Sequence, residues 1–204
     1  MNTVLSSGTA LTPSKIVCVG RNYVAHIEEL GNEIPEDMVV FIKPNSAISS
    51  TLQSSIEGEP LHYEGELVFL VRNNRFAAVG FGIDLTRREL QSRLKKKGLP
   101  WERAKAFNGA AVFSEFAPLP DELDKLSLRL QVAGAPRQAG GVEMMIYKPA
   151  TILSELQKFT TLEDGDLVMT GTPEGVGAIN PGERFEGAVL CGEDVLVSAS
   201  WVAQ

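Results

Sequence analysis

A short apolar run preceded by two glutamates is the feature that most constrains how this chain folds. Residues 67–71 read Leu-Val-Phe-Leu-Val, which is typical of a strand buried on both faces. His62, Glu64 and Glu66 come just before it at alternate positions, so a strand places all three on one face. Two carboxylates side by side repel each other, and protonation, a basic partner or a metal ion relieves that repulsion. The stretch predicts either a solvated polar strand end or an oxygen-ligand site for a hard cation such as Mg²⁺.

Composition places the chain among globular proteins. Its 204 residues are 44% hydrophobic and 22% charged, which favours one domain with a core of its own. We expect residues 1–14 to form a loosely held N-terminal arm and residues 15–204 to form the main domain. The net charge of −7 argues against nucleic acid as a partner, because phosphate binding requires a basic surface.

Nothing in the sequence indicates a membrane span or a secretion signal. No apolar run approaches the roughly 20 residues of a membrane helix, and residues 1–14 lack the pattern of a signal peptide. The two cysteines, Cys18 and Cys191, form no CxxC motif and no disulfide framework. We therefore expect a cytoplasmic protein with structural thiols and no membrane partner.

The remaining pattern predicts short helices between many strands. We expect Asn22 to cap a helix that ends before Gly31, and Thr86 with Glu89 to form the capping box of a second helix that ends before Gly98. The expected helices cover residues 23–30, 86–97 and 148–159, and the expected strands cover residues 15–19, 39–44, 67–71, 77–83, 127–132 and 167–170, with two more within 183–201.

Three sets of polar residues on these elements are candidates for chemistry. His26 and Glu29 are three apart on a predicted helix and share a face, which suits a general base but also describes an ordinary surface pair. Asp84 ends a strand just before the second helix, so it is either a third carboxylate for a metal or a turn-forming residue. Arg88 and Gln91 share one face of that second helix.

Two lysines and a glycine-rich segment complete the set. Lys43 ends an apolar strand and Lys105 stands between apolar residues, so each is either a solvated lysine or a group that binds an anion. Residues 170–177 read Thr-Gly-Thr-Pro-Glu-Gly-Val-Gly, which is either a plain turn or a cradle of N–H groups and hydroxyls for a carboxylate or phosphate. No P-loop motif is present.

Together these motifs resemble the small single-domain branch of the fumarylacetoacetate hydrolase family, within its acylpyruvase and oxaloacetate decarboxylase/tautomerase subgroup. The resemblance runs from Lys15 to Val197. It is carried by segments 19–23, 41–44, 62–67, 84–91, 97–105 and 170–177, together with His26 and Glu29.

The resemblance implies an α+β fold, namely a mixed β-sandwich roll with a few short helices, and usually a homodimer. It implies Mg²⁺ (or Mn²⁺) held by Glu64, Glu66 and Asp84, with a small 2-oxo-carboxylate as substrate. His26, Glu29 and Lys105 would be catalytic, with His26 and Glu29 as a proton-transfer dyad. The substrate-binding residues would be Arg21, Lys43, Arg88, Gln91 and Thr172.

The implied activity is metal-dependent hydrolysis of a C–C bond in acylpyruvate-type 2,4-dioxo acids through a metal-stabilised enolate. The alternative is an oxaloacetate decarboxylase/tautomerase or a 2-hydroxyhepta-2,4-diene-1,7-dioate isomerase with the same site. The hydrolase interpretation leads because a dyad formed by His26 and Glu29 suits the activation of water. A metal- or carboxylate-binding module without catalysis is the interpretation from a different functional class.

Overall fold

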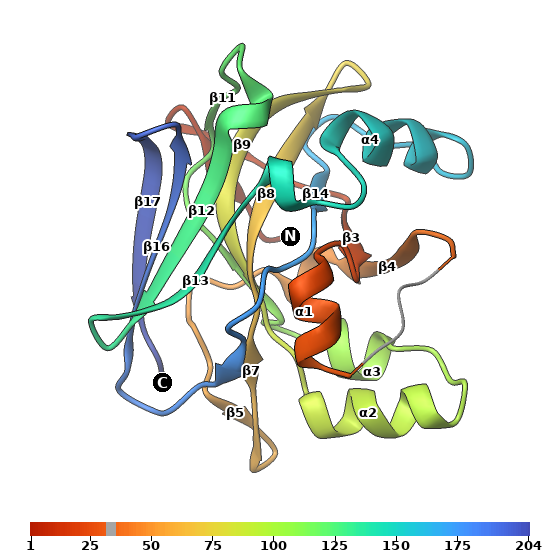
Figure 1. Cartoon of the computed structure of the whole chain (residues 1–204), viewed down its shortest axis with the longest axis vertical. Coiled ribbons are helices and arrows are strands. Elements are labelled where there is room, and N and C mark those ends of the chain that lie inside the picture. Colours follow the sequence, from red (N-terminus) through yellow and green to blue (C-terminus); the bar gives the residue numbers. More distant parts are fainter. Residues whose placement is uncertain (32–35) are drawn as a thin grey trace.

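The computed structural model describes residues 1–31 and 36–204 and contains two main β-sheets with short helices at their edges (Figure 1). The larger, seven-stranded sheet is mixed, because β14 runs parallel to β3 and the other pairs are antiparallel. It follows the order β10 (Ala111–Phe113), β9 (Arg75–Asp84), β8 (Gly65–Arg72), β14 (Leu167–Met169), β3 (Lys15–Gly20) and β4 (Val39–Pro44), with β11 (Ala117–Pro118) also paired to β9.

The smaller sheet is a four-stranded antiparallel sheet. Its order is β13 (Ala135–Gly141), β12 (Leu126–Val132), β16 (Arg184–Cys191) and β17 (Asp194–Val202). Within residues 1–31 and 36–204, three two-stranded ribbons lie outside these sheets: β1 (Val4–Ser6) with β2 (Thr9–Leu11), β5 (Ser55–Ile56) with β6 (Glu59–Pro60), and β7 (His62–Tyr63) with β15 (Gly177–Ala178). The α-helices are α1 (Val24–Glu29), α2 (Arg88–Lys96), α3 (Glu102–Lys105) and α4 (Pro149–Gln157), and short 3-10 turns cover Asn45–Ala47, Leu123–Lys125 and Val142–Met144. The expected α+β sandwich with few short helices is confirmed.

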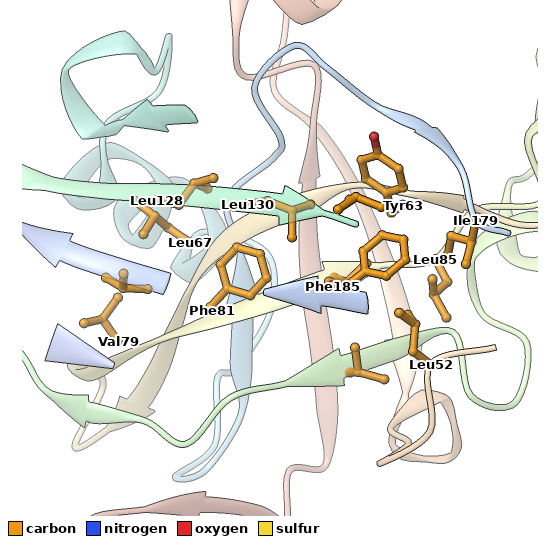
Figure 2. Close-up of a cluster of buried hydrophobic side chains, with 14 of the residues drawn as sticks. Leu52, Tyr63, Leu67, Val79, Phe81, Leu85, Leu128, Leu130, Ile179 and Phe185 are labelled. Atoms are coloured by element: carbon orange, nitrogen blue, oxygen red, sulfur yellow. The ribbon is translucent and has the colours of Figure 1, made fainter. Parts of the chain in front are cut away.

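The two sheets enclose the main hydrophobic core. Leu67 and Phe81 from the larger sheet pack with Leu130 and Phe185 from the smaller one (Figure 2). Strand β16 comes so close that a Cβ atom on Gly187 would lie 2.2 Å from the Phe81 ring. Burial of these large side chains between the layers supplies the main driving force for the fold.

Strand alternation sends the carboxylates to the other face of the larger sheet. Leu67 and Ile83 belong to the sandwich core, whereas Val68, two residues after Glu66, belongs to a separate cluster on the opposite face. Glu66 and Asp84 therefore lie on the face of the larger sheet that points away from the sandwich core. Helices α1, α2 and α3 gather near this end of the larger sheet (Figure 1).

Most predicted elements are present, but both predicted N-caps are wrong. The cap of α1 is Tyr23, and the side-chain amide of Asn22 instead donates to the carbonyl oxygens of Tyr147 (3.0 Å) and Thr170 (2.9 Å). Helix α2 begins at Arg88, and the fully buried Thr86 hydroxyl accepts a hydrogen bond from Lys105 (2.6 Å). In both cases the side chain forms hydrogen bonds with a residue distant in the sequence and not with the backbone N–H groups of the helix.

The N-terminal segment is held more firmly than expected. Residues 1–14 contain the β1–β2 hairpin, and Val4 is buried in the same cluster as Val68, on the face of the larger sheet that points away from the sandwich core. Asn2 and Asn45 exchange hydrogen bonds, including one of 2.7 Å from the Asn2 backbone N–H. The division of the chain into an arm and a catalytic domain stays a prediction. Among the described residues, no helix has the length and apolar character needed to cross a membrane.

Candidate metal centre and active site

Three buried carboxylates meet at the end of the β8–β9 hairpin. The backbone N–H of Asp84 donates to the carbonyl oxygen of Glu64 (2.8 Å), and Glu66 pairs with Gly82 on β9. This register brings one oxygen from each of Glu64, Glu66 and Asp84 within 4.8 Å of one another. The predicted third carboxylate therefore joins the other two, and we call this group the carboxylate trio.

Lys105 binds directly to this trio. Its ammonium donates to Glu64 Oε2 (2.8 Å) and Asp84 Oδ2 (2.8 Å), as well as to the Thr86 hydroxyl. The lysine lies at the end of α3, a four-residue helix that periodicity alone does not reveal, and only 2% of its surface is exposed. It is a buried charge facing anions, not a solvated surface lysine.

Lys43, expected to bind substrate, lies deeper than the pocket. Its side chain is fully buried, its Nζ lies 2.7 Å from Asp84 Oδ1, and it donates a hydrogen bond to the carbonyl oxygen of Lys105. It thus neutralises the rear of the trio and holds the end of α3. Its predicted contact with substrate stays a prediction.

The buried charges shift one another's pKa values. Burial alone would raise the pKa of Glu64. The charges of Lys105 and Arg88 lower this pKa by more than burial raises it, so the pKa lies well below the usual range of a glutamate and the carboxyl stays ionised. Burial and the neighbouring carboxylates of Asp84 and Glu64 raise the pKa of Glu66 well above its usual value. Burial would lower the pKa of Lys105, yet Asp84 and Glu64 raise it above the ordinary lysine value.

Helix α2 contributes a second cation next to the trio. Arg88 donates from Nη2 to Glu64 Oε1 and from Nη1 to Gln91 Oε1 (2.8 Å), so the predicted same-face pair is formed. The Nε–H of Arg88 is buried without a hydrogen-bond partner in the part of the chain that the structure describes. A buried donor of this kind is costly until a ligand or water accepts its proton.

The predicted dyad forms on α1 and is held by the glycine-rich loop. His26 Nδ1 lies 3.2 Å from Glu29 Oε2, and the other oxygen of Glu29 accepts the backbone N–H of Gly175 (3.0 Å). His26 is buried (7% exposed) and lines the pocket, whereas its partner Glu29 stays exposed to solvent. Contact at Nδ1 leaves Nε2 as the nitrogen available to a ligand.

The glycine-rich segment, residues 170–177, closes the site from the side of β14. The Gly171 N–H donates to Glu66 Oε2 (2.8 Å), and the Thr172 hydroxyl donates to the Gly65 carbonyl oxygen (2.9 Å). The Thr172 hydroxyl also accepts from the side-chain amide of Gln138 (2.7 Å). The segment therefore supports the carboxylate trio and is not a free turn.

One pocket is lined by the carboxylate trio together with His26, Arg88, Gln91, Lys105 and Thr172. Lys43 and Glu29 are not among its lining residues. Arg21 lies in its wall with a left-handed backbone (φ 57°), a conformation that non-glycine residues seldom adopt and that is often found at functional sites. Residues that the sequence did not single out also line it, among them Phe41, Lys95 and Trp101. The aromatic pair Phe41–Trp101 (centroids 5.9 Å apart) forms an apolar section of the wall.

Comparison with known proteins agrees with this arrangement. Residues 15–196 match the family model described as fumarylacetoacetate (FAA) hydrolase C-terminal. The chain is 40% identical over 189 residues to the oxaloacetate tautomerase of Escherichia coli (strain K12), covering 84% of this chain and 86% of that protein. It is 35% identical over 192 residues to the mitochondrial oxaloacetate tautomerase of Arabidopsis thaliana, covering 86% of each.

A solved structure extends the likeness to a liganded enzyme. The fumarylpyruvate hydrolase of Pseudomonas aeruginosa, crystallised with Mn²⁺ and pyruvate, superposes with a TM-score of 0.86 at 33% identity and covers 100% of this chain and 96% of that one. Family model, sequence relatives and superposed fold all lead to one assignment. This chain belongs to the fumarylacetoacetate hydrolase family of enzymes.

Proposed function

We propose that the carboxylate trio holds one divalent cation, Mg²⁺ or Mn²⁺, in an enzyme that acts on small 2-oxo carboxylates. The donor set supports this, because three carboxylates with oxygens within 4.8 Å of one another are the ligands that hard divalent cations prefer. The ammonium of Lys105 already lies between two of them, so the cluster attracts positive charge. A bound cation would polarise the 2-oxo group of the substrate and favour negative charge on its oxygen.

The charges around the trio support an anionic substrate. Three side-chain cations, Lys43, Lys105 and Arg88, already contact the carboxylates. A divalent cation alone would add excess positive charge to this buried site, and a carboxylate substrate would offset that excess. Cation and substrate should therefore strengthen each other's binding.

Arg88, Gln91 and Arg21 supply donors for such a substrate. The buried Nε–H of Arg88 has no partner in residues 1–31 and 36–204, so a ligand carboxylate would satisfy it. Arg21 lies elsewhere in the pocket wall and would bind a second anionic group. Thr172 contributes less through its hydroxyl, whose proton is already donated to the Gly65 carbonyl oxygen.

His26 is the proposed proton carrier. Glu29 holds the imidazole at Nδ1 and orients Nε2 as the exchanging atom. In tautomerisation, Nε2 would take a proton from carbon 3 of the 2-oxo acid and return it to the oxygen of the 2-oxo group, so that the imidazole ends the cycle in its starting state. The ammonium of Lys105 would stabilise negative charge developing on that oxygen.

The reaction that we place first is keto–enol tautomerisation of oxaloacetate. The observation that carries it is the similarity to oxaloacetate tautomerases over most of the chain. Buried His26, held by Glu29, lines the same pocket as the trio and would serve either reaction. Hydrolysis of acylpyruvate-type 2,4-dioxo acids is the second candidate, because the same dyad can activate water and a fumarylpyruvate hydrolase shares the fold. Both reactions need the same residues.

A substrate panel separates these reactions. Purified protein is assayed with oxaloacetate, acetylpyruvate and fumarylpyruvate, each with Mg²⁺, with Mn²⁺ and with EDTA. We expect rapid tautomerisation of oxaloacetate that EDTA stops, whereas cleavage of the dioxo acids alone would establish the hydrolase. Turnover unaffected by EDTA, or absent with all three substrates, would refute the proposal.

The homodimer and the cytoplasmic location stay predictions. Light scattering after size-exclusion chromatography tests the first, with a mass of twice the 22.1 kDa chain expected.

A further inference from the structure

The side chain of Gln138 is a buried amide that lies between two segments of the site. It belongs to β13 of the smaller sheet, where its neighbours Arg137 and Ala139 are exposed while Gln138 itself is 3% exposed. A glutamine is seldom this deeply buried, and a buried amide is costly unless each polar atom has a partner. The partners of Gln138 therefore indicate why the chain has an amide there.

Both ends of this amide are occupied. Its Oε1 accepts the Gly65 N–H (2.8 Å), and its Nε2 donates to the Thr172 hydroxyl (2.7 Å) and to the Pro173 carbonyl oxygen (2.8 Å). Thr172 in turn donates to the Gly65 carbonyl oxygen (2.9 Å), which closes a ring of hydrogen bonds. This arrangement uses the acceptor and both donor hydrogens of the amide.

The ring joins the two backbone segments that support the carboxylate trio. Gly65 is the residue between Glu64 and Glu66, so hydrogen bonds to its N–H and carbonyl hold the backbone from which both glutamate side chains project. Thr172 follows Gly171, whose N–H donates to Glu66 Oε2 (2.8 Å). Gln138 therefore adds a side-chain link between the glutamate strand and the loop, beside the direct bonds from Gly171 and Thr172.

Close packing leaves this link little freedom. A Cβ atom on Gly65 would lie 3.0 Å from Gln138 Oε1, and one on Gly140 would lie 2.8 Å from the Pro173 side chain. Smaller side chains at position 138 would lose hydrogen bonds that nothing nearby could replace without backbone movement. The position thus requires an amide of this length.

We propose that Gln138 is a positioning residue that sets the spacing of Glu64 and Glu66 by fixing their strand to the glycine-rich loop. It does not touch the pocket, and it acts on the site through Gly65 and Thr172. The inference rests on the proposed cation site. Outer-shell partners of metal ligands act in the same way elsewhere, and losing one typically weakens metal affinity about 10–100-fold.

The test is Mn²⁺ affinity, measured by calorimetry and by electron paramagnetic resonance on the full chain. Gln138→Met keeps the length and removes the amide, and we expect it to raise the Kd for Mn²⁺ by about 10-fold or more. Gln138→Asn keeps the amide but cannot span both segments, so we expect a smaller rise in the same direction. If Gln138→Met does not fold, Gln138→Asn decides.

A matched core variant separates positioning from general destabilisation. Val189→Ala opens a cavity in the smaller sheet, where Val189 is fully buried, and should lower the melting temperature with an unchanged Mn²⁺ Kd. Variants at Gln138 that bind Mn²⁺ as the wild type does would overturn the inference. If the wild type itself binds no Mn²⁺, the proposed function fails and this inference fails with it. That result differs from wild-type binding by the Gln138 variants, which would refute the inference alone.

Discussion

Replacing Lys105 with methionine removes an ammonium that hydrogen-bonds two members of the carboxylate trio. The lysine is 2% exposed, and its Nζ lies 2.8 Å from both Glu64 Oε2 and Asp84 Oδ2. Methionine fills a similar volume but leaves two buried carboxylates without this cation. Breaking a buried ion pair from one side costs about 3–5 kcal/mol, because the remaining charge stays desolvated.

That cost sets the size of the expected effect. For a chain of this length, each kcal/mol shifts the melting temperature by about 2–4 °C, so Lys105→Met should melt roughly 10 °C lower in EDTA. Saturating Mn²⁺ should raise the melting temperature of the variant more than that of the wild type, because the cation replaces the lost charge. Scanning calorimetry with EDTA and with Mn²⁺ measures both effects.

A surface lysine provides the control. Lys125 pairs with Glu122 at 2.7 Å, but both side chains are more than half exposed, so Lys125→Met should melt as the wild type does. A Lys105→Met variant that melts like the wild type in EDTA would refute the reasoning about the buried trio. Equal stabilisation of variant and wild type by Mn²⁺ would refute the exchange of lysine charge for metal charge.

Three further predictions follow from other contacts. His26→Gln should lower kcat for oxaloacetate tautomerisation by about 10²-fold or more with an unchanged Mn²⁺ Kd, and an unchanged kcat would remove His26 from the mechanism. Gly175→Ala should abolish turnover and lower the melting temperature, because its Cβ would lie 2.0 Å from the Arg137 carbonyl oxygen at a backbone φ of 95°; a fully active variant would contradict this geometry. Burial would raise the pKa of Asp166, but hydrogen bonds from Lys15 and nearby groups lower it overall, so its contribution is present above pH of about 4 and is lost as the pH falls through the lowered pKa. Urea unfolding should accordingly find Asp166→Asn less stable than the wild type at pH 7, with the difference shrinking toward pH 3; a difference that does not depend on pH would be inconsistent with this contact.

Local sequence patterns predicted the elements that carry the site. The apolar run at residues 67–71 predicted the buried strand, and the alternation of side chains along a strand placed Glu64 and Glu66 on one face. Asp84 could be placed near them because it ends the next strand of the same hairpin. Periodicity could not identify α3, since its four residues are too few to show a helical repeat.

Tertiary partners explain what the sequence could not reveal. Thr86 had the right spacing for a capping box, but it serves as an acceptor for Lys105 instead. Gln138 gave no local signal, because its partners Gly65, Thr172 and Pro173 belong to segments more than 30 residues away along the chain. Lys43 was recognised as a candidate anion-binding group, yet only the folded sheet shows that its partner is Asp84.

The most direct test of the central claim is anomalous diffraction from a crystal of the full chain soaked in Mn²⁺. The account predicts one strong peak per chain, about 2.0–2.3 Å from one carboxylate oxygen each of Glu64, Glu66 and Asp84. A strong peak elsewhere, with none at the trio, would contradict the assignment of these carboxylates as the metal site of the enzyme.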